Sequence, residues 1–461
     1  MRRSLLLINP AMMEKGRRLP NAGGIATMEP LALSQVAALT PPDWEVRILD
    51  EVREDIPDGI KPDLVGITSL SVTVPRAYDI ARRFRQGGVP VVLGGIHATL
   101  LPDEAARHVD VVFQGDAEGA WSVLIQDFEA GALKQRYNGG APSLRAMPIP
   151  RRDLYRKHYF MQLLSASRGC RHHCEFCTLW RLAGGRYRMR PVEDVLGELG
   201  GMSRQRPILF TDENIYTDRE WALTLFRGMA EGGLKRPYAV QTSLDLAEDG
   251  QALRALQHSG CVIVLIGFES VSEESLRTMR KHVNLRIGVE RYKEMVTRIR
   301  DHGIAVSGAF IFGNDGDDPG IFQRTAKFIV EAGIDVAHLG LLTPNPGTDL
   351  YDRLAREGRL LYTSFPEDYG RYDIRTAVFR PRNMTPEQLE SGIEWTTRAV
   401  GSWRVVAKRA WRTWRAVGKP SIAALSLSWN RSGLYRRVMA QAEHTRSLRD
   451  VVRTPAARGE E

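Results

Sequence analysis

The sequence predicts an α/β protein with two parallel-sheet domains followed by a helical C-terminal region. Short β-branched apolar runs alternate with amphipathic stretches over most of the chain, and a segment rich in Pro and Gly, "NGGAPSLRAMPIPRRD", interrupts them once. Such alternation is typical of parallel sheets covered by helices. We therefore expect a first domain over residues 1–140, a linker over 141–160, a second domain over 161–365 and a helical extension over 366–461.

The first domain is expected to be a doubly wound, Rossmann-like (flavodoxin-like) sheet. Its predicted strands are "SLLLINP", "EVRILDE", "DLVGITS", "PVVLGGIH" and "DVVFQG". Helices are predicted at "ALSQVAAL", "VPRAYDIARRFRQGG", "DEAARHV" and "AEGAWSVLIQDFEAG". In such sheets the ligand lies in the crevice at the carboxyl ends of the strands.

The second domain is expected to be a partial (β/α)6 barrel. Its series begins at "FMQLLSASRGC" and continues with strands at "PILFTDEN", "YAVQTSLD", "VIVLIGFES", "AVSGAFIFG" and "VAHLGLLTP". Helices such as "AEDGQALRALQHSG" and "VERYKEMVTRIRDHG" separate them. Six strand-helix units make an incomplete barrel, and active sites of such folds lie at the carboxyl ends of the strands.

Composition indicates a cytoplasmic protein with no nucleic-acid partner. The chain has 461 residues, and no apolar run approaches the roughly 20 residues of a membrane span. The start, "MRRSLLLINP", has too short an apolar run for a signal peptide and reads as a buried strand. The net charge of +9 is a modest excess at this length, which favours a solvated basic surface over nucleic-acid binding.

Three of the four cysteines lie within "SRGCRHHCEFCTLW", residues 167–180. A disulfide framework is not expected in a cytosolic protein of this size. A structural zinc site takes four ligands, and no second Cys or His pair lies at finger spacing. Three thiolates on a loop after a strand suit a 4Fe–4S cluster with one iron left open. Cys261, in "CVIVLIGF", is interpreted as a small buried apolar residue.

The loop "CRHHCEFC" resembles the cluster loop of the radical S-adenosylmethionine (SAM) superfamily at all three cysteines and at the aromatic Phe176. The resemblance implies that Cys170, Cys174 and Cys177 bind a 4Fe–4S cluster. It also implies that the open iron chelates the amino and carboxylate groups of SAM. An electron from the cluster then cleaves the sulfonium to methionine and a 5′-deoxyadenosyl radical that abstracts hydrogen.

The same resemblance implies that SAM is held at the ends of the barrel strands. "FTDEN" stands where the family contacts the methionine amine, although this chain lacks the common Gly-Gly-Glu. "QTSLD" and "IGFES" end the next two strands, "SGAFIFGNDGDD" resembles the adenine-side strand and "LTPNPGTDLYDRL" the sixth-strand loop. The residues expected to contact SAM are Phe176, Asp212, Glu213, Asn214, Ser243, Glu269, Gly308 and Gly313.

The first domain resembles the cobalamin-binding domain that precedes the radical domain in one large subgroup. The matching segments are "PDLVGITSLSVTVPRAYDIARRFR" and "PVVLGGIHATLLPDEAARHVDVVFQGDAEGAW". Cobalamin is therefore an expected cofactor. The residues expected near it are Ser69, Ser71, Thr73, Gly94, Gly95, His97, Gly115 and Glu118.

His97 leaves three interpretations open. The chain lacks the Asp-x-His-x-x-Gly sequence of proteins that coordinate cobalt from below, and His97 stands instead in "GGIHAT". The residue is interpreted as a loop residue near the corrin or its nucleotide, as a structural histidine, or as a cobalt ligand.

The resemblance implies an enzyme of the hopanoid-methylase-like (class B) subgroup, a cobalamin-dependent radical SAM methyltransferase. Methylcobalamin would transfer a methyl group to an unactivated carbon of a lipid or natural-product intermediate. The alternatives are a radical cyclisation, rearrangement or dehydration without methyl transfer, and a non-catalytic cobalamin or redox sensor. The expected partners are a small-molecule or lipid-like substrate and a reductase or flavodoxin as electron donor. No residue is predicted as a catalytic acid, base or hydrogen donor.

The segment "WRVVAKRAWRTWRAVGK" predicts a basic amphipathic helix. An apolar face is expected from Trp403, Val406, Ala410, Trp411, Trp414 and Val417, with Arg404, Lys408, Arg412, Arg415 and Lys419 facing away. One interpretation is a helix docked on the barrel with its basic face in solvent. The other is contact with an anionic membrane surface, which would fit a lipid-like substrate.

Overall fold

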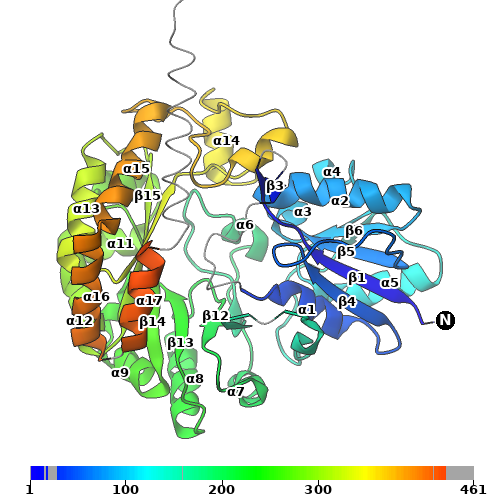
Figure 1. Ribbon diagram of the computed structural model, residues 1–461, viewed down its shortest axis with the longest axis horizontal. Coiled ribbons are helices and arrows are strands. Elements are labelled where there is room, and N and C mark those ends of the chain that lie inside the picture. Colours follow the sequence, from blue (N-terminus) through cyan, green and yellow to red (C-terminus); the bar gives the residue numbers. More distant parts are fainter. Residues whose placement is uncertain (1, 15–16, 19–27, 158, 419, 432–461) are drawn as a thin grey trace, which may run out of the picture.

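The computed structural model describes residues 2–14, 17–18, 28–157, 159–418 and 420–431. Within these ranges the chain forms two six-stranded sheets, one in the blue and cyan half of Figure 1 and the other in the green to orange half. No helix of the described residues is both long and apolar enough to cross a membrane.

The first sheet consists of β1 (Ser4–Asn9), β4 (Glu45–Asp50), β5 (Leu64–Thr68), β6 (Val91–Gly94), β7 (Val111–Gln114) and β8 (Arg136–Asn138). All its strand pairs are parallel, in the order β4-β1-β5-β6-β7-β8. Counted along the chain this is 2-1-3-4-5-6, the flavodoxin-like order with one added edge strand. A separate antiparallel pair joins β2 (Met13–Glu14) and β3 (Arg17–Arg18).

Apolar residues on both faces explain why the first sheet is buried between helices. Along β1, Leu6 and Ile8 belong to one core cluster while Leu5 and Leu7 belong to another, because successive side chains of a strand point to opposite faces. The helical segments of this domain are α1 (Leu31–Leu39), η1 (Ser71–Thr73), α2 (Val74–Gln86), α3 (Ile96–Leu100), α4 (Pro102–Ala105), η2 (Ala117–Gly119) and α5 (Trp121–Glu129).

The second sheet consists of β9 (Gln162–Leu164), β12 (Ile208–Phe210), β13 (Tyr238–Thr242), β14 (Cys261–Glu269), β15 (Ala305–Phe312) and β16 (Val336–Leu341). Its strands are parallel and follow one another in chain order. This is the order of a partial (β/α) barrel. Between β9 and β12 the chain also forms a short antiparallel ribbon, β10 (Ser167–Arg168) with β11 (Arg188–Met189).

Helices separate the strands of the second sheet and begin and end with local signals. Asp249 accepts the N–H groups of Gln251 and Ala252 at the start of one helix, and Gly260 ends that helix with φ of +102°. The helical segments are η3 (Arg152–Leu154), α6 (Leu179–Ala183), α7 (Val192–Gly201), α8 (Arg219–Glu231), η4 (Leu244–Glu248), α9 (Gly250–Ser259), α10 (Glu273–Thr278), α11 (His282–Ile287), η5 (Val289–Arg291), α12 (Tyr292–Asp301), α13 (Ile321–Ala332), α14 (Asp349–Arg356) and η6 (Glu367–Arg371).

Three helices follow the second sheet: α15 (Pro386–Gly401), α16 (Trp403–Val417) and α17 (Pro420–Arg431). In Figure 1, α15 and α16 lie among the outer helices of this sheet, and α17 contacts β16. A buried arginine, Arg409, attaches α16 to the barrel by donating to the carbonyl oxygens of Ile334 (2.9 Å) and Asp335 (3.2 Å). The predicted fold class, with a doubly wound first domain, a partial barrel and a helical C-terminal region, is thus confirmed.

The predicted faces of α16 are wrong in part. Val406 and Val417 are buried as expected, but Trp403, Trp411 and Trp414 are 57%, 52% and 50% exposed. The face against the barrel is instead completed by two polar residues, Arg409 and Thr413, whose hydrogen bonds satisfy them there. Of the predicted outer residues, Arg404, Lys408 and Arg415 are exposed, Arg412 is half-buried, and Lys419 lies outside the described residues.

Candidate active site

The cysteine loop begins immediately after β10. Gly169 has φ of +96°, and a Cβ there would lie 2.1 Å from the carbonyl oxygen of Arg186, so no other residue fits. Its N–H donates to the Glu213 carboxylate at 2.8 Å. Cys174 is buried, whereas Cys170 and Cys177 are half-buried. All three cysteines are free thiols on a loop whose first residue has a fixed backbone.

Glu175, between two of these cysteines, anchors the loop to the far side of the barrel. Its carboxylate oxygens accept from Nε and Nη2 of Arg353 in α14, at 2.7 and 3.0 Å. Its N–H donates to the carbonyl of Met279, and its own carbonyl accepts from the N–H of Leu350, both at 3.1 Å. Glu175 therefore holds the loop both by backbone hydrogen bonds and by its ion pair with Arg353.

A buried ion pair lies beside the thiols. Lys281 Nζ donates to Glu269 Oε1 at 2.7 Å, and both side chains are nearly inaccessible to solvent. Burial opposes the charge of Lys281, but the adjacent Glu269 carboxylate and the Cys174 thiol hold its pKa above the usual value. Burial raises the pKa of the Cys177 thiol to about 11, and the cation of Lys281 opposes that rise. Lys281 is thus the positive charge that favours thiolates at this loop.

The predicted polar residues after β12 and β13 come together. Asp212 is fully buried and accepts from the Ser167 hydroxyl and from the N–H of Ala166 at 3.2 Å. Desolvation raises its pKa to about 7. Asn214 donates to the Ser243 hydroxyl at 3.0 Å. These carboxyl and amide groups lie at the strand ends beside the cysteine loop, as the sequence predicts.

The other predicted SAM residues have different surroundings. Glu269 has φ of +61°, an uncommon conformation for a non-glycine residue. Gly308 makes room for Phe268 and Phe310, whose ring atoms would lie 3.1 Å from a Cβ. Gly313 has φ of +101° and abuts Leu389. Phe176 packs, half-buried, against the barrel core. Contact of these residues with SAM stays a prediction.

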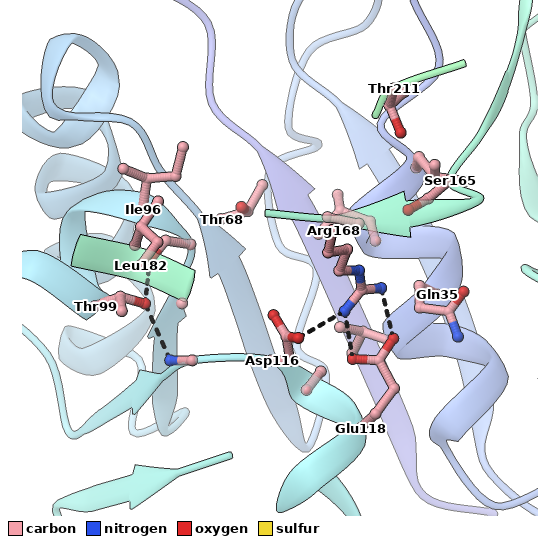
Figure 2. Close-up of a pocket in the computed structure, with 18 of the residues that line it drawn as sticks. Gln35, Thr68, Ile96, Thr99, Asp116, Glu118, Ser165, Arg168, Leu182 and Thr211 are labelled. Carbon is pink, nitrogen blue, oxygen red and sulfur yellow. Dashed lines mark hydrogen bonds and ion pairs between the residues drawn. The ribbon is translucent and has the colours of Figure 1, made fainter. Parts of the chain in front are cut away.

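A cavity of about 530 Å³ lies between the two domains. Figure 2 shows Thr68, Ile96, Thr99, Asp116 and Glu118 of the first domain facing Ser165, Arg168, Leu182 and Thr211 of the second. Gly94 and Gly95 after β6, Gly115 after β7, and Gly169 of the cysteine loop also line it. The carboxyl ends of the first sheet and the start of the cysteine loop therefore border one space.

The predicted cobalamin residues divide into two groups in the structure. Gly94, Gly95, Gly115 and Glu118 line the cavity. The other four are not among the described residues that line it, and each is hydrogen-bonded within the protein. Ser69 is buried and donates its N–H to Gly94, the Ser71 hydroxyl pairs with His97, and the Thr73 hydroxyl donates to Leu70.

His97 belongs to this second group. It lies on α3, is completely buried, and its Nε2 lies 2.8 Å from Glu104 Oε2 and 3.2 Å from the Tyr78 hydroxyl. Its ring also meets Tyr369 of η6 edge-on at 4.8 Å. These contacts favour the structural interpretation of His97, and a role at the corrin or at cobalt stays a prediction.

Sequence reasoning missed several residues of the site. Thr68 and Thr99 line the cavity, Lys281 lies beside the thiols, and Arg168 and Arg188 point toward Asp116. Thr68 is the last residue of β5, directly before the predicted Ser69, so the expectation that ligand residues follow the strand ends missed it by one position. Arg168 directly precedes "GC", and this position next to the cysteine loop could have marked it as a site residue. No sequence signal pointed to Lys281, because it is more than 100 residues from the three cysteines of the loop.

The residues present fit the two implied groups. Within the described ranges, no three His, Cys, Asp or Glu side chains have the spacing expected around one metal ion. A 4Fe–4S cluster spreads its thiolate bonds over different irons, so its ligands need not surround one metal position, and Cys170, Cys174 and Cys177 lie on one short loop. The cavity offers donors (Arg168, Thr68) and acceptors (Asp116, Glu118), which suit the amide-rich rim of a corrin.

Known proteins share both domains with this chain. The family model for the radical SAM superfamily matches residues 164–329, and that for the B12 binding domain matches residues 26–125. The chain is 30% identical over 425 residues to bacteriochlorophyllide d C-12(1)-methyltransferase of Chlorobaculum tepidum, covering 88% of this chain and 89% of that protein. It is 28% identical over 352 residues to hopanoid C-2 methylase of Rhodopseudomonas palustris, covering 73% and 66% respectively.

A solved structure has the same fold. It is the radical SAM methyltransferase TsrM of Kitasatospora setae with cobalamin and a 4Fe–4S cluster bound, with a TM-score of 0.66 and 18% identity over 86% of this chain and 88% of that one. The two matched domains identify the cofactors of this chain as a 4Fe–4S cluster, SAM and cobalamin, which confirms the prediction. The chain belongs to the cobalamin-dependent radical SAM methyltransferases.

Proposed function

We propose that this enzyme transfers a methyl group to an unactivated carbon of a large, mainly apolar small molecule. The observation that carries the proposal is the shared cavity: the strand ends of the B12 binding domain and the first residue of the cysteine loop line one space. Methyl transfer from cobalamin to a carbon radical needs both cofactors within reach of one substrate atom.

The roles of the chain's residues follow from this arrangement. When bound, the cluster supplies the electron that cleaves SAM, and cobalamin carries the methyl group. Cys170, Cys174 and Cys177 hold the cluster in our proposal. The carboxyl and hydroxyl groups at the ends of β12 and β13 orient SAM. The apolar floor of the cavity, which includes Leu33 and Val36, keeps water from the reacting atoms.

The substrate class is inferred from the relatives. Their names give a bacteriochlorophyllide and a hopanoid as the methylated molecules, which are both polycyclic and largely apolar. We propose a lipid or natural-product intermediate of that kind here. The electron donor in our proposal is a reductase or flavodoxin, because cleavage of the sulfonium needs a strong one-electron reductant.

The products distinguish methyl transfer from its alternative. Anaerobically reconstituted enzyme with dithionite, SAM, hydroxocobalamin and either bacteriochlorophyllide d or a hopanoid is expected to release S-adenosylhomocysteine together with 5′-deoxyadenosine. Mass spectrometry should show one added methyl group on one acceptor. Release of 5′-deoxyadenosine with a rearranged, unmethylated product would instead establish the cyclisation or rearrangement alternative. If the enzyme released neither S-adenosylhomocysteine nor 5′-deoxyadenosine, the proposal would be overturned.

We also propose that α16 contacts an anionic membrane surface. Residues 403, 407, 411 and 414 repeat at helical spacing, and Trp403, Trp411 and Trp414 are each at least half exposed. Arg404, Lys408 and Arg415 follow on the same outer side, and the Arg415 guanidinium lies 5.0 Å from the Trp411 ring centre. We call these six residues the tryptophan patch. Exposed Trp beside Lys and Arg is the combination that suits the interface of an anionic bilayer.

Vesicle sedimentation tests the tryptophan patch. The protein is expected to sediment with phosphatidylglycerol-containing vesicles and not with pure phosphatidylcholine vesicles. Because a basic residue near such a surface contributes about 1 kcal/mol, the R404Q/K408Q/R415Q variant should bind roughly 100-fold more weakly. A matched R82Q/R277Q/K327Q variant, which removes three exposed cations elsewhere, should bind like the wild type. Equal binding of both variants, or no binding of the wild type, would contradict the proposal.

A further inference from the structure

Arg168 occupies the boundary between the cavity and the cysteine loop. It is the second residue of β10 and is followed directly by Gly169 and Cys170. Figure 2 shows its guanidinium pointing from the barrel side across the cavity toward Asp116 and Glu118. The side chain is only 22% exposed. A buried cation at this position needs partners, and it takes them from the other domain.

The partners of Arg168 form a charged bridge between the domains. Nη1 and Nη2 of Arg168 lie 3.0 and 2.8 Å from the two oxygens of Glu118, and Nη1 lies 3.1 Å from Asp116. Arg188, which pairs with Arg168 in the β10–β11 ribbon, donates to Asp116 at 2.7 Å. We call Asp116, Glu118, Arg168 and Arg188 the interdomain bridge. Two cations of the barrel domain thus hold two carboxylates of the B12 binding domain.

The backbone around Arg168 connects the interdomain bridge to the start of the cysteine loop. The Ser167 hydroxyl donates to buried Asp212, and the Gly169 N–H donates to Glu213 at 2.8 Å. Gly169 is confined by the carbonyl of Arg186. Arg168 therefore sits between two residues tied to the barrel, and Cys170 follows Gly169 directly, so the way Arg168 is held helps to define where the cysteine loop begins.

The carboxylate side of the bridge is equally confined. Gly119, next to Glu118, has the carbonyl oxygen of Gly139 where a Cβ would be, only 1.9 Å away. Asp116 N–H donates to the Gly140 carbonyl at 2.9 Å. The loop after β7 that carries both carboxylates is therefore tightly packed. A group that enters the cavity beside the bridge therefore meets carboxylates whose backbone is held in place.

We propose that Arg168 is a positioning residue that couples occupancy of the cobalamin cavity to SAM binding at the cluster. Amide groups at a corrin rim have the donors and acceptors to engage Arg168, Asp116 and Glu118. Occupancy of the cavity changes the hydrogen bonding of the bridge, and the bridge borders the start of the cysteine loop. The inference rests on the proposed function, since it takes the cavity as the cobalamin site. A bridge that only joined the domains would contribute to stability without linking the two ligands.

Ligand linkage without turnover tests the coupling. The dissociation constant of SAM is measured by calorimetry on reconstituted, oxidised protein, with and without hydroxocobalamin. Cobalamin is expected to tighten SAM binding about fivefold or more in the wild type. In R168M, measured with enough hydroxocobalamin to saturate its weaker site, the change should fall below about twofold, while the iron content persists. R168K keeps the charge but loses the two-pronged contact with Glu118, so an intermediate coupling is expected.

The control is R151M, which removes an arginine paired with Asp153 at an exposed site of the connecting segment. It should couple the ligands like the wild type. Full coupling in both R168M and R168K, or none in a wild type that binds both ligands, would overturn the coupling alone. A wild type that binds no cobalamin would overturn the proposed function. If R168M does not fold, as judged by circular dichroism, R168K and E118Q replace it. Weakened coupling in these two variants would then support the proposal, and full coupling in both would overturn it.

Discussion

Replacement of Cys174 by alanine is expected to abolish the 4Fe–4S cluster and all SAM cleavage. Three cysteines are the whole protein ligand set of such a cluster, so losing one leaves two irons without a protein bond. Cys174 is also the buried member of the three, and a water molecule has little room to replace its thiolate. Reconstituted wild-type protein should hold about four irons per chain and show a broad charge-transfer absorbance, and C174A should lack both.

Cys261 provides the matched control. It lies at the start of β14, is 2% exposed, and belongs to the barrel core. C261A should keep the iron content, the absorbance and 5′-deoxyadenosine release of the wild type, and lose only a little stability through a small cavity. If C174A retained the spectrum, or if C261A lost it, the assignment of the cluster to "CRHHCEFC" would be wrong.

The arrangement of the fold was predictable because its signals are local. Each buried strand is a short apolar run between turn residues, and the strand ends then gather at one edge of a parallel sheet. That reasoning brought Asp212, Glu213 and Asn214 to the cysteine loop and Gly94, Gly95 and Gly115 to the cavity, where the structure has them. For these residues, their position at the end of a strand was enough to predict where they lie.

Side-chain direction and long-range pairing were not predictable in this way. His97 follows β6 as a ligand residue would, but α3 begins at Ile96 and turns the imidazole into the core, onto Glu104 and Tyr369. Helical spacing grouped the tryptophans of α16 with its valines, whereas the barrel buries Arg409 through main-chain carbonyls and leaves the indoles outside. In both cases partners distant in sequence decided the orientation.

Lys281 is the strongest example of such a distant partner, and its removal should have the second large effect. K281M leaves the Glu269 carboxylate buried, without its 2.7 Å partner and beside the Cys174 thiol. Uncompensated buried charges of this kind cost about 3–5 kcal/mol. Loss of the cation also disfavours thiolate formation at the loop. We expect a lower free energy of unfolding of the apoprotein in urea and, after reconstitution, far less iron than the wild type.

Two further variants separate the structural effect from the effect on the thiols. K281M/E269Q removes both charges, so the free energy of unfolding should recover most of the loss, while iron binding should stay weak because no cation faces the loop. K281R keeps the cation and should retain more iron than either methionine variant. If the double variant regained full iron content, Lys281 would serve only to neutralise Glu269. If K281M itself matched the wild type in stability and iron, the buried pair would have no role in forming the cluster site. The expected pattern, stability restored without cluster binding, assigns the positive charge of Lys281 to the thiolates and not only to its carboxylate partner.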